Sequence, residues 1–117
     1  MITTSYFGKL QYIQNPVAIT VSKPKWFTGK HYSKLAPPKL LVQSYKNGEI
    51  NQDEYTELYN EFVLDKLDPI NTYKEIVDTF GNDATLLCYE RSTDFCHRHL
   101  VRDWFNNTRF NVKELKF

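Results

Sequence analysis

The chain has 117 residues, of which 41% are hydrophobic and 25% charged, and its formal net charge is +1. This length is close to the commonest domain size, so we expect a single domain over residues 1–117. No apolar run is long enough to cross a membrane, and residues 1–5 lack the features of a secretory signal. Two cysteines are too few for a secreted disulfide scaffold, so we expect reduced thiols and a cytoplasmic location.

Charge is distributed unevenly along the chain. Residues 1–48 contain seven lysines and no acidic residue, whereas residues 49–117 contain eight basic and fourteen acidic residues. A basic half indicates a polyanionic partner, for which a nucleotide or a nucleic acid is the candidate. The alternative is that these lysines face the acidic helices of the same chain.

The first half of the chain predicts two strands and a long loop. We expect a weak strand over Ile2–Phe7 and a buried strand over the β-branched run Val17–Val21. Residues 23–39 contain three prolines and a glycine, which exclude a long regular element. Lysines beside flat rings suit phosphates and stacked bases, so this loop supplies three candidate ligand-binding residues. They are Lys25, Trp26 and Tyr32.

Two helices are predicted next from their end signals. Asn51 followed three residues later by Glu54 forms a capping-box pattern before an apolar stripe. Asp68-Pro69 starts a second helix, with proline at its first position, and Gly81 ends it.

The remaining chain predicts a strand, a helix and a strand. Ala84–Tyr89 is a compact apolar run typical of a central strand, and Ser92 or Thr93 is the expected cap of a helix that runs to about Asn107. Residues 110–117 add a candidate edge strand. This alternation favours the α/β class, as a compact three-layer α/β/α domain with a parallel or mixed sheet.

The candidate site is the segment that follows the central strand, residues 88–98. Ligands of open α/β sheets bind beyond the carboxyl ends of the strands, and a helix start offers free N–H groups to an anion. Arg98 could add charge-assisted hydrogen bonds to a phosphate. Helical phase points His97 toward the sheet, where a buried imidazole needs a partner, and Glu90 is a candidate.

Several roles are open for these residues. His97 is either a satisfied core residue or a general acid–base group, and Cys88 could reach it across the strand–helix turn. Cys96 is its sequence neighbour, and neighbours on a helix do not face each other. Paired metal-ligand spacings are missing, so no metal and no cofactor is expected.

The strand Leu86–Glu90, a short polar link and the motif Phe95-Cys96-His97-Arg98 resemble the signature of the bacterial and phage family called domain of unknown function 488. The N-terminal Thr4–Phe7 resembles the opening strand of that family. The resemblance implies a three-layer α/β domain with the signature at one end of its sheet, and no settled reaction. Cys88, Glu90, Cys96, His97 and Arg98 fill the signature positions. Ser5-Tyr6 stands where many members carry Ser-Arg, which leaves Arg98 or a loop lysine to meet an anion.

Whether the chain is an enzyme is open at this point. The first hypothesis is a small enzyme that acts on a nucleotide, a modified base or a nucleic-acid end, with His97, Glu90, Cys96 and Cys88 as catalytic candidates. Ser5, Tyr6 and Arg98 join the three loop residues as ligand-binding candidates. The alternative is a non-catalytic module that binds nucleic acid or protein through loop 23–39. A third hypothesis, thiol redox chemistry, requires the two cysteines within disulfide reach.

Overall fold

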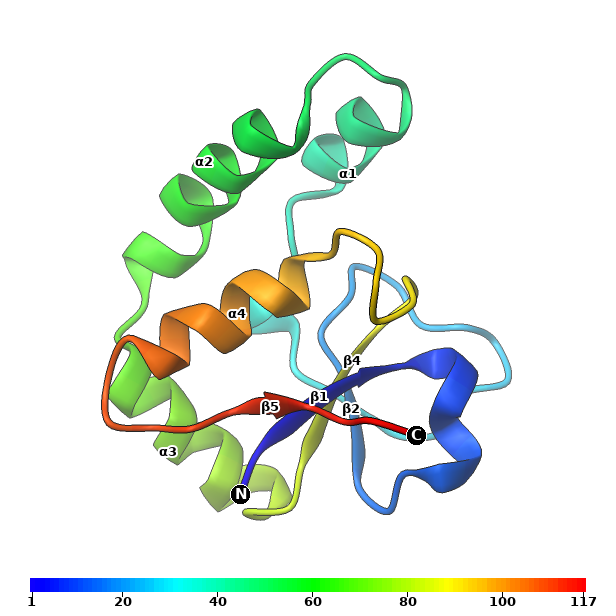
Figure 1. The fold of residues 1–117 in the computed structure, drawn as a ribbon, viewed down its shortest axis with the longest axis vertical. Coiled ribbons are helices and arrows are strands. Elements are labelled where there is room, and N and C mark those ends of the chain that lie inside the picture. Colours follow the sequence, from blue (N-terminus) through cyan, green and yellow to red (C-terminus); the bar gives the residue numbers. More distant parts are fainter.

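The computed structural model describes all residues from Met1 to Phe117. A five-stranded sheet runs through the molecule in the order β3-β2-β4-β1-β5, and every pair of neighbouring strands is parallel (Figure 1). The strands are β1 (Thr3–Tyr6), β2 (Pro16–Ala18), β3 (Lys30–His31), β4 (Thr85–Cys88) and β5 (Lys113–Glu114). The α/β class and the parallel sheet expected from the sequence are therefore confirmed.

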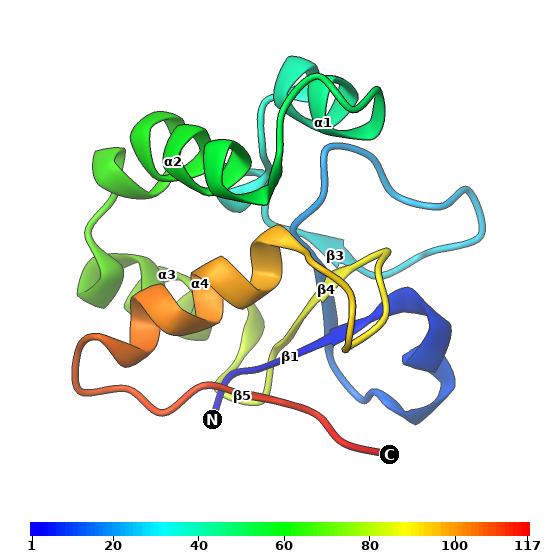
Figure 2. The same ribbon diagram turned by 45° about the horizontal axis from the view of Figure 1, so that its top comes forward.

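Helices connect the strands and gather on one side of the sheet, where α2, α3 and α4 lie together and α1 follows above them (Figure 2). The α-helices are α1 (Lys39–Lys46), α2 (Gln52–Phe62), α3 (Pro69–Phe80) and α4 (His97–Asn106). Three 3-10 helices complete the chain: η1 (Phe7–Tyr12), η2 (Ser33–Leu35) and η3 (Leu64–Lys66). None of these helices has the length and apolar character needed to cross a membrane.

The predicted helix starts of α2 and α3 are confirmed. Asn51 accepts the N–H of Glu54 at 2.8 Å, and the Glu54 carboxylate accepts the N–H of Asn51 at 3.1 Å, so both hydrogen bonds of the capping box form. Asp68 accepts the N–H of Asn71 at 2.8 Å, with Pro69 at the first helical position. In each case a short polar side chain satisfies an N–H that the helix itself leaves unpaired.

The two faces of the sheet are covered unequally, because alternate residues of each strand point to opposite faces. Val17, Ile19, Leu86 and Cys88 belong to the main core of 18 buried residues, which the α-helices cover. Ala18 and Leu87 point the other way, into a small cluster with Phe7 and Phe27. The second outer layer is thus built from the 3-10 helix η1 and loop residues, where a three-layer domain ordinarily has α-helices.

Three details differ from the sequence predictions. The expected caps Ser92 and Thr93 are wrong: α4 begins at His97, with Cys96 as its N-cap. The Ser92 hydroxyl instead donates to Glu114 at 2.6 Å, so it is not free to cap a helix. The segment 23–39 is less irregular than expected, because it contains β3 and η2. Helix α1 had no prediction.

Candidate active site

A pocket with a volume of about 470 Å³ lies beyond the carboxyl ends of β2 and β4. From the end of β2 the chain continues to β3 on one side, while from the end of β4 it continues through α4 to β5 on the other side. The connections diverge at this point, which is where ligands bind in open parallel sheets. The expectation that the site lies at this end of the sheet agrees with this geometry.

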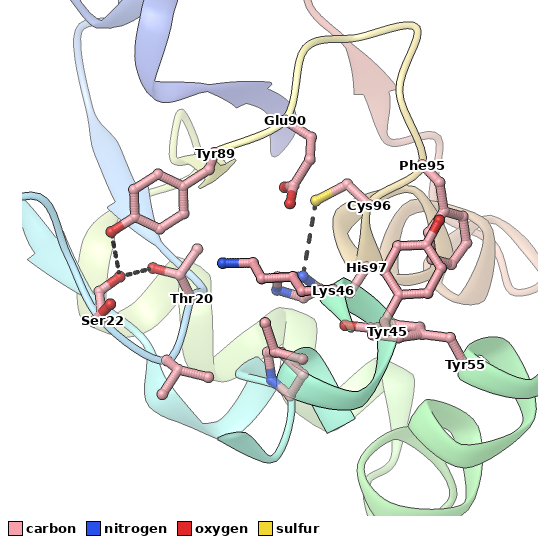
Figure 3. A pocket seen from close by; sticks show the side chains of 13 residues that line it. Thr20, Ser22, Tyr45, Lys46, Tyr55, Tyr89, Glu90, Phe95, Cys96 and His97 are labelled. Carbon is pink, nitrogen blue, oxygen red and sulfur yellow. Dashed lines mark hydrogen bonds between the residues drawn. The ribbon is translucent and has the colours of Figure 1, made fainter. Parts of the chain in front are cut away.

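The pocket combines aromatic walls with a few polar groups (Figure 3). Helix α1 contributes Tyr45 and Lys46, α2 contributes Tyr55, and the turn after β4 contributes Tyr89 and Glu90. The other lining residues are Thr20, Val21, Ser22, Pro37, Val42, Phe95, Cys96 and His97. Mostly apolar walls with a small number of placed polar groups are typical of small-molecule sites.

His97 is held at the edge of the pocket by a single strong hydrogen bond. Its Nε2 lies 2.6 Å from the carbonyl oxygen of Ile19, the residue directly after β2. Because a carbonyl oxygen can only accept, Nε2 carries the proton, and in the neutral ring Nδ1 is left as an acceptor. This Nδ1 lies 3.8 Å from Cys96 Sγ and 3.5 Å from Cys88 Sγ, which is also 3.6 Å from Nε2.

Cys96 faces His97 despite being its sequence neighbour, so the prediction that the two residues point apart is wrong. Neighbouring residues point apart only where both are helical. Cys96 is the N-cap, with extended backbone angles of φ −156° and ψ 148°. This conformation returns its side chain over the first turn of the helix, to the acceptor nitrogen of His97.

Burial raises the pKa of the Cys96 thiol well above its usual value. The neighbouring Cys88 raises the pKa further, whereas His97 lowers it through a hydrogen bond and its charge. Cys96 is therefore a neutral thiol at neutral pH, which can donate a proton to His97 Nδ1.

Glu90 is not the partner of His97, since the Ile19 carbonyl takes that place. The Glu90 side chain is exposed and lines the pocket, where its carboxylate points toward the Cys96 sulfur (Figure 3). The Lys46 ammonium extends into the pocket from the opposite helix (Figure 3). Neither of these charged groups has an ion-pair partner within the chain, so both are free to meet a ligand.

Arg98 is placed away from the pocket and is fully buried. Its Nε and one terminal nitrogen donate to the Glu114 carboxylate at 3.1 and 2.9 Å, and its other terminal nitrogen donates to the Glu90 carbonyl at 2.7 Å. The Tyr6 ring lies 5.8 Å from this guanidinium. With these partners the guanidinium has no free face for a phosphate, and Tyr6 lies beside the ion pair and does not line the pocket.

Ser5 and Tyr32 also lie outside the pocket. The Ser5 hydroxyl is buried without a hydrogen-bond partner, on the face of the sheet opposite Thr4. Tyr32 packs in the main core and donates its hydroxyl to Glu75 at 2.6 Å, and Lys34 pairs with the same carboxylate at 2.8 Å. Part of the basic loop therefore faces an acidic helix of its own chain.

Trp26 and Lys25 remain exposed on the loop before β3. Trp26 is 62% exposed, and its ring contacts Phe7 edge-on at 6.2 Å between centroids. The Phe7 ring in turn lies 4.9 Å from Tyr89, which lines the pocket. The exposed loop and the pocket are thus joined through Phe7, which contacts both rings, although Trp26 itself does not line the pocket.

One cluster has the donor set of a metal site. The ligand atoms of Cys88, Cys96 and His97 all lie within 4.8 Å of one another, and all three residues are buried. Two thiols and an imidazole nitrogen are ligands for soft or borderline cations such as Zn²⁺.

Sequence reasoning missed the pocket residues of α1, α2 and the end of β2. Tyr45 and Lys46 lie on α1, which begins after Pro38 without a side-chain cap and so lacks a start signal in the sequence. The apolar pair Leu41 and Tyr45, four residues apart, was an available signal for α1. Thr20 and Ser22 could have been found as the polar residues that follow a buried strand.

The fold and the pocket define a parallel α/β domain with a small-ligand site at the point where the chain connections diverge. Residues 13–109 match the family model described as the active DUF488-N3 subclade, so the chain belongs to the domain of unknown function 488 family. The matched segment contains every pocket-lining residue, whereas Ser5 and Tyr6 precede it. No curated protein and no solved structure matches the chain.

Proposed function

We propose that this chain is an enzyme that acts on a nucleotide, a nucleoside or a modified base bound in the pocket. The observation that carries the proposal is the meeting of Cys96 and His97 at the wall of a pocket of about 470 Å³ that also presents one free lysine and one free carboxylate. A pocket of this size holds a small molecule. The matched subclade is described as active, which agrees with an enzymatic role.

The walls suit a flat, charged ligand. Tyr45, Tyr89 and Phe95 line the pocket and offer ring faces on which a base can stack. Lys46 is the cation placed to meet a phosphate, which is the role that the sequence suggested for Arg98. Glu90 can accept hydrogen bonds from ring or exocyclic N–H groups of a base.

The reacting groups lie at the start of α4. His97 Nδ1 is an acceptor whose orientation is fixed by the hydrogen bond to Ile19, and Cys96 supplies a neutral thiol 3.8 Å away. With Nε2 anchored and Nδ1 beside the Cys96 thiol, which lines the pocket, the imidazole is arranged to exchange a proton with that thiol.

A non-catalytic binding module is the second candidate. It is favoured by the 62% exposure of Trp26 beside the unpaired Lys25, since an exposed ring next to a lysine suits a stacked base and its phosphate. In that case the ligand is a single-stranded oligonucleotide, and the thiol–imidazole cluster has only a structural role.

A thermal-shift experiment against nucleosides, nucleotides and short oligonucleotides separates the two candidates. The enzyme proposal predicts a rise in melting temperature with one small nucleotide or nucleoside, lost in Lys46→Ala and in Tyr89→Ala but kept in Lys25→Ala. The module predicts a shift with oligonucleotides alone, which salt weakens and Lys25→Ala or Trp26→Ala removes. A shift confined to oligonucleotides and independent of Lys46 would contradict the enzyme proposal.

A further inference from the structure

Cys88, Cys96 and His97 have the spacing of tetrahedral metal ligands. His97 Nδ1 lies 3.5 Å from Cys88 Sγ and 3.8 Å from Cys96 Sγ, and all three atoms lie within 4.8 Å of one another. Zinc bonds of about 2.3 Å to sulfur and about 2.0–2.1 Å to nitrogen place tetrahedral ligands roughly 3.6–3.8 Å apart. The two sulfur–nitrogen distances already have this value, and the sulfurs need to approach each other by about 1 Å at most.

The orientation of the imidazole fits a metal ligand as well. Nε2 donates to the Ile19 carbonyl at 2.6 Å, which leaves Nδ1 of the neutral ring with a free lone pair, 3.8 Å from Cys96 Sγ. Cys88 Sγ lies 3.5 Å from Nδ1 and 3.6 Å from Nε2, over the ring, so it must shift toward Nδ1 to share a cation with it. Histidines that bind metals ordinarily donate their second N–H to a carbonyl or carboxylate in this way, which fixes the tautomer and the ring plane.

The fold brings the three ligands together from two elements. Cys88 is the last residue of β4, whereas Cys96 and His97 are the N-cap and the first residue of α4. The turn between them has no paired ligand spacing, and for this reason the sequence predicted no metal. The turn between β4 and α4 brings Cys88 close to Cys96 and His97, although the three residues do not form a closely spaced ligand motif in the sequence.

The site is closed on one side and open on the other. Cys88 is fully buried and does not line the pocket, while Cys96 and His97 do. A cation among these three ligands would keep its fourth position toward the pocket, as catalytic zinc sites with three protein ligands do. Thiolates and imidazole select zinc-like cations over Mg²⁺ and Ca²⁺, which prefer oxygen.

We propose that Cys88, Cys96 and His97 bind one zinc ion whose fourth position faces the pocket. The two cysteines then serve as thiolate ligands, and a water molecule takes the open position. A zinc ion in this position would polarise a ligand that is bound in the pocket. This chemistry rests on the proposed function, whereas the binding of the metal rests on the three ligands alone.

Cobalt titration of the untagged, fully reduced and metal-free protein tests the site. We expect one Co²⁺ per chain, with thiolate-to-metal charge-transfer absorption and the visible bands of tetrahedral cobalt, and displacement of both by one equivalent of Zn²⁺. Cys88→Ser and Cys96→Ser should lose the charge-transfer absorption in part or whole, and His97→Gln should weaken binding. His99→Gln is the matched control, because it removes an imidazole two residues away and should leave the spectrum unchanged.

The wild-type titration decides the question even if a cysteine variant does not fold. Absence of tetrahedral cobalt absorption in the folded wild-type protein would overturn the metal site. A nucleotide-induced thermal shift in that same metal-free protein would then retain the proposed function without the metal. Stoichiometric metal binding without any small-ligand shift would support the metal site and count against the proposed function.

Discussion

The guanidinium of Arg98 and the carboxylate of Glu114 join helix α4 to the edge strand β5. Two hydrogen bonds, of 3.1 and 2.9 Å, connect the planar groups, and Thr4 and Ser92 donate to the same carboxylate. The Arg98 side chain is completely buried and that of Glu114 is 13% exposed. The arginine of the signature motif therefore stabilises the turn in which the pocket residues lie.

Arg98→Ala should destabilise the fold strongly. Removal of one partner leaves a largely buried carboxylate without its counter-charge, for which the expected loss in free energy of unfolding is about 3–5 kcal/mol. Urea denaturation measures this loss. Arg102→Ala is the control, because Arg102 pairs with Asp103 on the surface at 3.0 Å and such pairs contribute less than about 1 kcal/mol. An Arg98→Ala protein of wild-type stability that failed to bind a nucleotide would restore Arg98 as a ligand residue.

Stability should fall in acid through the titration of Glu114. Burial raises the pKa of this carboxyl, but hydrogen bonds from Arg98, Ser92 and Thr4 outweigh it and lower the pKa to about 2 from the usual 4.5. The contribution of the charged form is complete above the unfolded pKa of about 4.5 and is lost as the pH falls toward 2.

Each unit of pKa difference corresponds to about 1.4 kcal/mol, and solvent screening of this half-buried carboxyl reduces the expected effect to about 1–2 kcal/mol. Chemical denaturation at pH 5, 4 and 3 measures it, and Glu114→Gln is the comparison. The variant should be less stable at neutral pH and should lose less stability over this range. Parallel pH dependence in both proteins would assign the acid sensitivity to other carboxyl groups.

His97→Ala should cost about 1–3 kcal/mol of stability, because it removes packing and leaves the buried Ile19 carbonyl without a donor. The amide of His97→Gln can donate to the same carbonyl. If His97 has only a structural role, this variant should therefore regain both the stability and the ligand binding that His97→Ala loses. The proposed enzymatic role predicts recovery of stability and ligand binding without recovery of turnover. Denaturation and thermal shift on both variants, followed by an activity assay once a bound ligand is found, check this expectation.

The elements with local end signals were predictable from the sequence. Asn51 with Glu54, and Asp68 with Pro69, form hydrogen bonds within a single helical turn, so their pattern in the sequence determines where α2 and α3 begin. Helix α4 lacks such a signal. Its N-cap Cys96 makes no side-chain capping bond, and Ser92 is occupied by Glu114, which is 22 residues away. Because Glu114 is so distant in the sequence, the local pattern around Ser92 does not show that Ser92 bonds to Glu114 and not to the start of α4.

The site was predictable in position and less so in composition. The segment after β4 holds Glu90, Cys96 and His97 as expected, because a strand followed by a helix identifies the end of the sheet at which ligands bind. The partner of His97 was not predictable, since the Ile19 carbonyl belongs to the backbone and carries no side-chain signature. Lys46 was missed because it approaches the pocket from a helix whose position depends on tertiary packing.

The variant Tyr32→Phe tests whether Tyr32 has a structural role or binds a ligand. The Tyr32 hydroxyl donates to Glu75 at 2.6 Å from within the core, so its removal should lower the free energy of unfolding by about 1–2 kcal/mol. Small-nucleotide and oligonucleotide shifts should both be unchanged, because the ring is buried and does not line the pocket. If the chain is a binding module, Trp26→Ala should have the opposite effect. Its stability should change little, but the rise in melting temperature with oligonucleotides should be lost. Reduced ligand binding by Tyr32→Phe at full stability would instead show that the Tyr32 ring leaves the core to meet a ligand.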